Sequence, residues 1–171
     1  EVAGIKEAIR EKAQAAGFDA AGFASATDDG TPGAHLAAFL ARGLHGDMGW
    51  MARTAERRAS PRALWAQARS VVAFGASYAP ANDPLASINR RDCATVRVYA
   101  RGRDSPTVLK TRPPGSPRRM AETYACDAQV LADTAPLIEK PLAPTSGAGW
   151  PAQHTHLAPP RSTARLLCAA V

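Results

Sequence analysis

Residues 70–76 read Ser-Val-Val-Ala-Phe-Gly-Ala, a continuous apolar run. Such a run predicts a central strand, because a strand covered on both faces needs no polar side. Helical and strand patterns alternate on either side of it. Helices are expected at 5–16, 35–42, 61–68, 107–110 and 120–124, and strands at 19–24, 95–99 and 130–132. This alternation favours an α/β (α+β) domain in which a mixed sheet is layered between flanking helices.

Particular residues mark the ends of these elements. Gly17 and Gly43 are expected to end the first two helices, since glycine adopts a left-handed conformation without strain. Pro61 suits the first turn of the third helix. Residues 27–33 and 79–92 are rich in polar residues, glycine or proline and are expected to form a turn and a loop.

The size and charge of the chain limit its class. Its 171 residues suit a single domain, and aromatic residues make up only 6% of it, so large core side chains are few. The net charge is +6 and the sequence pI is about 9.7. This basic balance favours an anionic partner such as RNA or a phosphorylated cofactor. The alternative is a generally arginine-rich composition that serves no specific partner.

The cysteines favour a reducing compartment. Cys93, Cys126 and Cys168 stand far apart, and no Cys-x-x-Cys pair occurs that could begin a zinc or iron–sulfur site. Scattered cysteines of odd number without a signal peptide suggest the cytoplasm. No apolar run reaches the eighteen or so residues that a membrane span needs, so no membrane partner is expected. The first residue is Glu1, already inside a helical pattern, which suggests a fragment.

Prolines interrupt the second half of the chain. Residues 111–119 read Thr-Arg-Pro-Pro-Gly-Ser-Pro-Arg-Arg. Proline removes a backbone donor and clashes with the preceding turn, so this stretch is expected to lack regular structure. Residues 158–162 break the chain again. These local conflicts argue against smooth folding.

An aspartate stands where one expected strand ends. Residues 130–132, Val-Leu-Ala, favour a short buried strand that stops at Asp133, and Pro136 suits the first position of a following helix. Ligands of open α/β folds bind at the carboxyl ends of strands. Asp133 is therefore a candidate site residue. The alternative is that it only caps the helix that follows.

A set of short motifs carries a family resemblance. They are Gly46-Asp47-Met48-Gly49-Trp50-Met51, Glu56-Arg57-Arg58-Ala59-Ser60-Pro61, Ala68-Arg69-Ser70-Val71-Val72, Tyr99-Ala100-Arg101-Gly102-Arg103-Asp104, Val108-Leu109-Lys110, Asp133-Thr134-Ala135-Pro136, Glu139-Lys140-Pro141-Leu142-Ala143, Gly149-Trp150 and His154-Thr155. Through them the chain resembles the amino-terminal region of epoxyqueuosine reductase, almost from end to end.

The resemblance implies a chemistry and a fold. The family reduces the epoxide of epoxyqueuosine in the tRNA anticodon loop, using cobalamin and two [4Fe–4S] clusters of a ferredoxin-like segment. Its amino-terminal domain is similar to the cobalamin-binding domain of reductive dehalogenases and has a nitroreductase-like fold. Asp133 corresponds to the family's proposed proton donor. Opening an epoxide leaves an alkoxide that must be protonated, and a carboxylic acid can do this when burial or a nearby anion raises its pKa.

The resemblance also implies a cofactor-binding set. Its members are Arg58, Arg97, Asp133, Gly149, Gln153 and His154. Arg58 would bind corrin amides or phosphate, with a surface charge as the alternative. Gly147, Gly149 and Trp150 match a turn that brings the backbone close to the cofactor, although such a turn also occurs without a ligand.

Two further pairs of residues each allow two interpretations. Arg101 and Arg103 either face the tRNA backbone or are solvated. His154 and His156 would share a face in a strand, but no third ligand is evident, so no metal site is expected.

Several departures from the family leave alternatives open. Asp104-Ser105-Pro106 replaces the usual Asp-Tyr-His, Gln153 stands where a lysine is usual, and His156 replaces an asparagine. No cysteine cluster motif precedes Val171, so the chain is expected to be a monomeric cofactor- and tRNA-binding part that is inactive alone. It is also expected to bind cobalamin weakly or not at all. The alternatives are a degenerate, non-catalytic relative and a flavin-binding nitroreductase-like protein.

Overall fold

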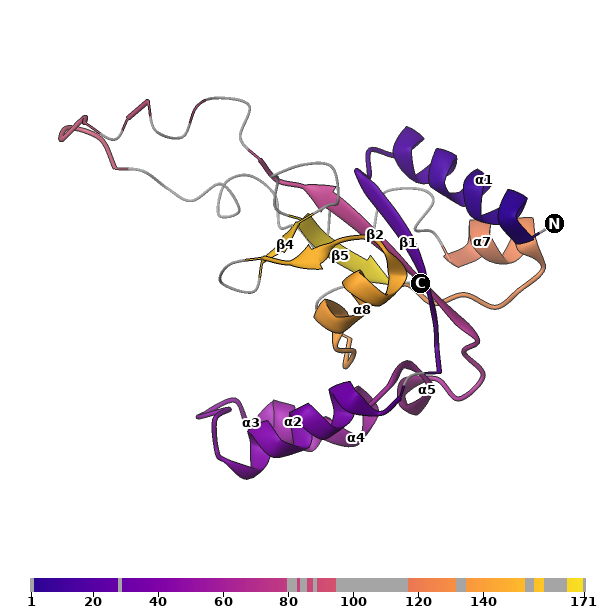
Figure 1. Ribbon diagram of the computed structural model, residues 1–171, viewed down its shortest axis with the longest axis horizontal. Helices are drawn as coiled ribbons and strands as arrows, with labels where there is room; N and C mark the ends of the chain where they lie inside the picture. Colours follow the sequence, from indigo (N-terminus) through magenta and orange to yellow (C-terminus); the bar gives the residue numbers. More distant parts are fainter. Residues whose placement is uncertain are drawn as a thin grey trace.

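The computed structural model describes residues 2–27, 29–79, 83, 86–87, 89–94, 117–131, 135–152, 156–158 and 166–170. Its elements are α1 (Val2–Ala15), β1 (Ala20–Ser25), α2 (Thr31–Ala41), α3 (Gly49–Arg53), α4 (Ala55–Arg58), α5 (Pro61–Leu64), β2 (Ser70–Ser77), α7 (Pro117–Tyr124), α8 (Glu139–Ser146), β3 (Trp150–Pro151), β4 (Leu157–Ala158) and β5 (Leu166–Ala170). The strands form one sheet in the order β1-β2-β5-β4-β3 (Figure 1). None of the described helices is long and apolar enough to cross a membrane.

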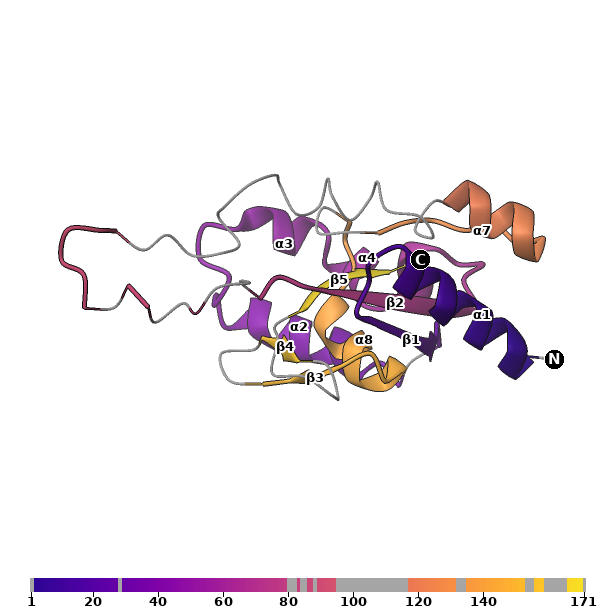
Figure 2. The ribbon, with the colours of Figure 1, turned by 90° about the horizontal axis from the view of Figure 1, so that it is seen from above.

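Strand β2 runs between β1 and β5 and is covered on both faces. Val72 and Phe74 pack into one cluster with Ile9 of α1, while Val71 packs on the other side with Leu142 of α8. Figures 1 and 2 show α1 and α8 on the two sides of the sheet. This double burial explains why the apolar run has no polar alternation, and it confirms the expected central strand.

The cluster around Phe74 has the most buried members of the three core clusters in the described part of the chain. Phe74 is 1% exposed, and its ring centroid lies 5.1 Å from that of Phe18. Burying an aromatic side chain of this kind stabilises the fold by about 1.5–3 kcal/mol. Ile9 and Ala13, four residues apart, bury the inner face of α1. Gly17 follows with φ 81°, so the expected end of this helix is confirmed.

Helix α8 lies directly on β1 at a glycine. A Cβ built on Gly22 would come within 2.5 Å of the Ser146 carbonyl oxygen and 2.6 Å of the Ala148 nitrogen. Gly147 then ends the helix at φ 74°, and the Ala148 N–H returns to the Ala143 carbonyl oxygen at 3.0 Å. The close approach therefore depends on the missing side chain of Gly22.

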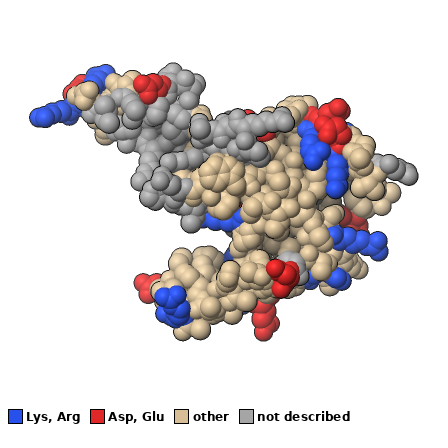
Figure 3. Space-filling view, viewed as in Figure 1, with Lys and Arg blue, Asp and Glu red and all other residues tan. Residues whose placement is uncertain are grey.

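Helices α2 to α5 form a separate group below the sheet. Figure 1 shows this group beside the end of β1, and the space-filling view shows a hollow between it and the body of the molecule (Figure 3). The group is itself tightly packed, because a Cβ on Gly33 of α2 would come within 2.9 Å of the Ala59 carbonyl oxygen. The helical group, defined here as residues 31–64, thus borders the sheet across a depression.

Strand direction differs from the expectation of a mixed sheet. Every pairing among the described strands is antiparallel, including β1 with β2 and β2 with β5. A continuous apolar run indicates cover on both faces and carries no information about strand direction, so it did not predict the antiparallel pairing of the described strands. The relation to a nitroreductase-like fold remains a prediction.

Some boundaries also differ from the sequence expectations. Helix α2 begins at Thr31, earlier than 35, because Pro32 is tolerated in a first helical turn. Helix α5 is a single turn that ends at Leu64 and does not reach 68. Helix α7 begins at Pro117, so the last residues of the 111–119 break are helical, again with proline at the start.

The segment around 130–142 needs the largest correction. Leu131 forms only an isolated bridge and is half-buried, and Val130 has no regular structure. A run this short does not separate a strand from an extended segment packed on the core. Helix α8 begins at Glu139, so Pro136 is not its first residue. Pro136 lies instead in a turn, where the Leu137 N–H donates to the Ala135 carbonyl at 2.8 Å.

Other expectations fall on residues that the structure does not describe. These are the strand at 95–99, the helix at 107–110, the stretch 111–116 and residues 132–134. The expected loop at 79–92 agrees with the structure wherever its residues are described.

Candidate functional site

A cavity of about 430 Å³ lies between the carboxyl end of β1, the start of α2, the α4–α5 turn and α8. Its polar lining comes from Ser25, Thr27, Asp29, Arg58, Ser60 and Thr145. Its apolar lining comes from Ala24, Pro32, Ala59, Pro61, Leu137, Ile138, Pro141 and Leu142. An apolar depression with a few polar groups is the usual form of a small-molecule site.

Arg58, at the end of α4, is the only lysine or arginine among the described residues that line the cavity. The side chain is half-buried, and its Nε donates to Thr54 Oγ1 at 2.8 Å. The guanidinium carbon lies 4.9 Å from the ring centroid of Trp50. No ion pair is formed by Arg58 with a carboxylate in the described part of the chain. Its charge is therefore held in place by neutral partners, and no other described residue bonds the terminal nitrogens, which are available to a ligand.

The turn that follows Arg58 is fixed by local capping. Ser60 is the N-cap of α5, and its Oγ accepts a hydrogen bond from the Ala63 N–H at 3.1 Å. Pro61 follows at the first helical position and is buried. This combination of a serine cap and proline is a sequence signal for a helix start, and it directs the chain from the helical group into β2.

Asp29 contributes a carboxylate on the α2 side of the cavity. Its Oδ1 accepts a hydrogen bond from the Thr31 N–H at 3.0 Å. This bond, with a further one from the Thr31 side chain, lowers the pKa of the Asp29 carboxyl below its usual value of 3.8. Asp29 therefore stays ionised at neutral pH and serves the start of α2.

The lowered pKa of Asp29 has a consequence for acid stability. Because the folded pKa is depressed, the stabilisation is present above about 3.8 and is lost as pH falls through the lower, folded value. We expect Asp29→Asn to be less stable than the wild type at pH 6, with the difference shrinking at pH 3. Urea unfolding of both proteins at the two pH values measures this. An equal difference at both would contradict it.

The facing wall belongs to α8 and the residues before it. Leu137 is buried and Ile138 is the N-cap of α8. Asp133 lies outside the described residues, a few positions before Leu137 in the sequence. Since Ile138 occupies the N-cap, the interpretation of Asp133 as the cap of this helix is wrong.

Two of the six residues in the expected cofactor-binding set, Arg58 and Gly149, are described by the structure. Arg58 lines the cavity. Gly149 does not line it; this residue is buried behind α8, where its N–H donates to the Ala143 carbonyl at 3.3 Å. Arg97, Gln153, His154 and Asp133 lie outside the described residues, so their roles remain predictions.

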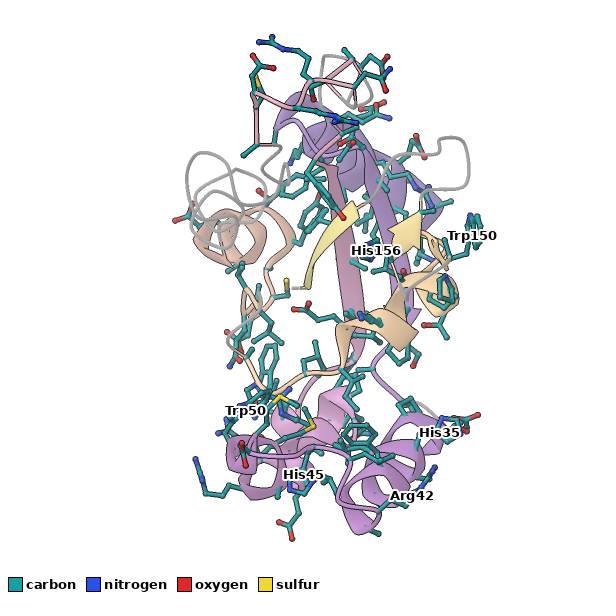
Figure 4. All side chains as sticks on the ribbon, turned by 90° about the vertical axis from the view of Figure 1, so that its left-hand side faces the viewer. His35, Arg42, His45, Trp50, Trp150 and His156 are labelled. Atoms are coloured by element: carbon teal, nitrogen blue, oxygen red, sulfur yellow. The ribbon has the colours of Figure 1, made fainter. Side chains whose placement is uncertain are left out.

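Sequence reasoning missed the partners of Arg58. The sequence signal is a spacing of four residues between Trp50, Thr54 and Arg58. In a helix this spacing predicts that the three side chains share one face. Figure 4 shows Trp50 on the helical group and Trp150 at the β3 edge of the sheet, so the two exposed tryptophans serve different surfaces.

The three described histidines lie apart from one another. Figure 4 shows His35 and His45 on the helical group and His156 near β4. Within the described residues, no group of three or more His, Cys, Asp or Glu side chains is placed to hold a metal ion. Cys93 and Cys126 are both exposed.

Comparison with known proteins gives a consistent family. The family model "Epoxyqueuosine reductase QueG, DUF1730" matches residues 58–134, a range that begins at Arg58 and includes Asp133. The chain is 37% identical to an epoxyqueuosine reductase of Burkholderia pseudomallei over 92% of its own length and 42% of the relative. For the enzyme of Xanthomonas campestris the identity is 35%, over 87% of this chain and 42% of the relative. The chain thus spans about two fifths of the length of these relatives.

Solved structures share the fold. A crystal structure of epoxyqueuosine reductase with an epoxyqueuosine-modified tRNA stem loop superimposes with a TM-score of 0.73 at 21% identity, covering 99% of this chain and 45% of that chain. The enzyme from Streptococcus thermophilus gives 0.71 at 18% identity, covering 97% and 45%. At these identities the likeness shows the fold alone.

Proposed function

Because this chain belongs to the epoxyqueuosine reductase family, we propose that it is the part of such an enzyme that holds cobalamin and the modified tRNA nucleoside. The reaction is the reduction of the epoxide of epoxyqueuosine to the alkene of queuosine in the tRNA anticodon loop. We also propose that the domain has a nitroreductase-like fold.

One observation carries this proposal. Arg58, expected at the cofactor, and Leu137, just beyond the expected proton donor Asp133, line the same cavity. They are far apart in the sequence, so only folding brings them together. Sites that combine a cation with an apolar wall suit a ligand that is largely apolar but carries phosphate or amide oxygens.

The cavity fits a portion of a cobalamin and not the whole. A corrinoid is larger than a space of about 430 Å³ can enclose, so one edge of it would lie against Arg58 and the α8 wall. The rest would be covered by protein outside this chain. When bound, cobalamin supplies an electron-rich cobalt centre for the reduction. Two [4Fe–4S] clusters would deliver electrons, and their ligands are not among the widely spaced Cys93, Cys126 and Cys168.

The chain's own residues would position the substrate and move the proton. Asp133 would donate a proton to the epoxide oxygen, so that ring opening would give a neutral hydroxyl in place of an alkoxide. Loss of that hydroxyl as water would take a second proton, from solvent, and the reduction as a whole would consume two electrons from the external reductant. Leu137 and Leu142, both buried on the cavity wall, would limit the access of bulk water. Arg58 would hold the ligand by hydrogen bonds from its terminal nitrogens.

The tRNA is the proposed macromolecular partner. The net charge of +6 favours binding of a polyanion, and a solved relative is bound to an epoxyqueuosine-modified stem loop. We propose that Arg101 and Arg103 contribute to this contact, that the protein acts in the cytoplasm and that it is a monomer.

We expect the chain to bind hydroxocobalamin weakly, with a dissociation constant of about 10–100 μM, because only one edge of the corrinoid can be buried. Equilibrium dialysis at increasing cobalamin concentrations measures this, and Arg58→Met should weaken it further. Submicromolar binding would contradict the expected share of buried surface. A flavin spectrum in the purified chain would instead favour the nitroreductase-like alternative.

A further inference from the structure

The helical group contains a connected series of three side chains. Trp50 belongs to α3, Arg58 ends α4, and Thr54 stands at the break between the two helices with φ −111° and ψ 12°. At four-residue spacing these residues lie one above another on the same face. Their alignment survives the break because Thr54 makes side-chain bonds in both directions.

The Thr54 hydroxyl makes one hydrogen bond as donor and one as acceptor. It donates to the Trp50 carbonyl oxygen at 2.9 Å, and its oxygen accepts the Nε–H of Arg58 at 2.8 Å. A hydroxyl has one proton and two lone pairs, so the two bonds are compatible and fix its orientation. A threonine that bonds to the carbonyl four residues earlier also bends a helix, which accounts for the break between α3 and α4.

The Trp50 ring lies against the same guanidinium. Its ring centroid lies 4.9 Å from Arg58 Cζ, within the range of a stacking interaction. The tryptophan is 44% exposed, an unusual degree for so large an apolar side chain. The Nε bond and the ring contact together restrict the orientation of Arg58 at the cavity wall.

The two terminal nitrogens of Arg58 remain as ligand donors. Asp29 lines the same cavity, but its carboxylate accepts from Thr31 and makes no ion pair with Arg58. A guanidinium with both terminal nitrogens available matches the oxygens of a phosphate in a bidentate manner. Holding it in place before binding lowers the entropy lost when the ligand arrives.

We propose that Thr54 and Trp50 are positioning residues that hold Arg58 in the cavity to bind a phosphodiester. The inference rests on the proposed function in one respect, namely that this cavity takes a ligand of the reductase reaction. Two such ligands carry a phosphodiester: the nucleotide portion of cobalamin and the backbone of the tRNA.

The first experiment measures positioning without any ligand. The Nε–Hε signal of Arg58 is observed in a ¹H–¹⁵N correlation spectrum of the ¹⁵N-labelled chain. It is assigned by its loss in Arg58→Lys. We expect slow solvent exchange of this proton in the wild type and in Thr54→Ser, which keeps the hydroxyl. Exchange should be about tenfold faster in Thr54→Val, which keeps the shape but removes the acceptor. Equal exchange in all three proteins would overturn the positioning role.

The second experiment measures ligand binding by NMR titration with hydroxocobalamin, with cobinamide, which lacks the phosphodiester, and with a short RNA stem loop. We expect Thr54→Val to weaken the binding of one phosphodiester ligand about tenfold and to leave cobinamide unchanged, with Thr54→Ser close to the wild type. Weakening confined to cobalamin identifies its nucleotide, and weakening confined to the RNA identifies the tRNA backbone. Equal weakening for cobinamide, or none for either phosphodiester, would overturn the proposal.

A variant pair separates this proposal from the proposed function. On an Arg58→Met background, Thr54→Val should have little further effect, because the hydroxyl acts through the guanidinium. An undiminished effect there would overturn the coupling. If the wild type bound none of the three probes, the proposed function would fail, while the exchange measurement would still report whether Thr54 orders Arg58.

Discussion

Asp133→Asn is expected to slow the single-turnover reduction of epoxyqueuosine in tRNA by about 10²–10⁴-fold while leaving cobalamin bound. Asparagine has the size and the hydrogen-bonding reach of aspartate but has no acidic proton to deliver to the epoxide oxygen. The measurement needs a protein of full family length in which residues 1–171 form the matching segment. Conversion is followed with a chemical reductant, beside a visible spectrum of the bound cofactor.

The position at which α8 begins makes the Asp133→Asn test specific to proton donation. Because Ile138 is the N-cap of α8, a change at Asp133 does not remove the cap of that helix. Asp127→Asn is a matched control, since Asp127 is an exposed residue that precedes the same segment. The control should react at the wild-type rate. Wild-type turnover by Asp133→Asn would exclude it as the proton donor, and joint loss of cofactor and activity would assign it a structural role.

Gly22→Ala is expected to destabilise the fold by about 3 kcal/mol and to lower Tm by about 6–12 °C. The added Cβ would meet backbone atoms at 2.5 and 2.6 Å, the Ser146 oxygen and the Ala148 nitrogen. Backbone at a helix end cannot rotate away as a side chain can, so α8 must move from β1. Thermal unfolding followed by circular dichroism measures the change.

The same substitution elsewhere in the chain gives the control. Gly4 lies within α1, and a Cβ there would meet nothing within 4 Å. Gly4→Ala should therefore stabilise the protein by about 0.4–1 kcal/mol, because alanine restricts the unfolded chain and suits a helix. Opposite signs are expected for the two variants. A Tm of Gly22→Ala at or above the wild-type value would show that the α8–β1 contact is loose.

The displacement of α8 in Gly22→Ala should also reach the cavity. Leu142 and Thr145 of α8 line it, opposite Arg58. A shift of this wall changes the space that a ligand would fill, so we expect weaker hydroxocobalamin binding even at temperatures where the variant is folded.

The sequence by itself determined the elements whose causes are local. The apolar run 70–76 became β2, and the spacing of Ile9 and Ala13 before Gly17 became α1 with its end. Periodicity, caps and glycine conformations act over a few residues, so they can be read along the chain. The motifs also indicated the family. The resemblance in turn predicted Arg58 as a cofactor-binding residue and Asp133 as the proton donor.

Only the tertiary structure decided how these pieces meet. Strand direction, the start of α8 at Glu139 and the joining of Arg58 with Leu137 at one cavity all depend on contacts between distant segments. No local sequence pattern predicts that the end of α8 packs closely against Gly22. None predicts that the Thr54 hydroxyl bonds both the Trp50 carbonyl and Arg58. Burial patterns specify which side chains need cover. Packing in three dimensions specifies what covers them, and it is packing that creates the site.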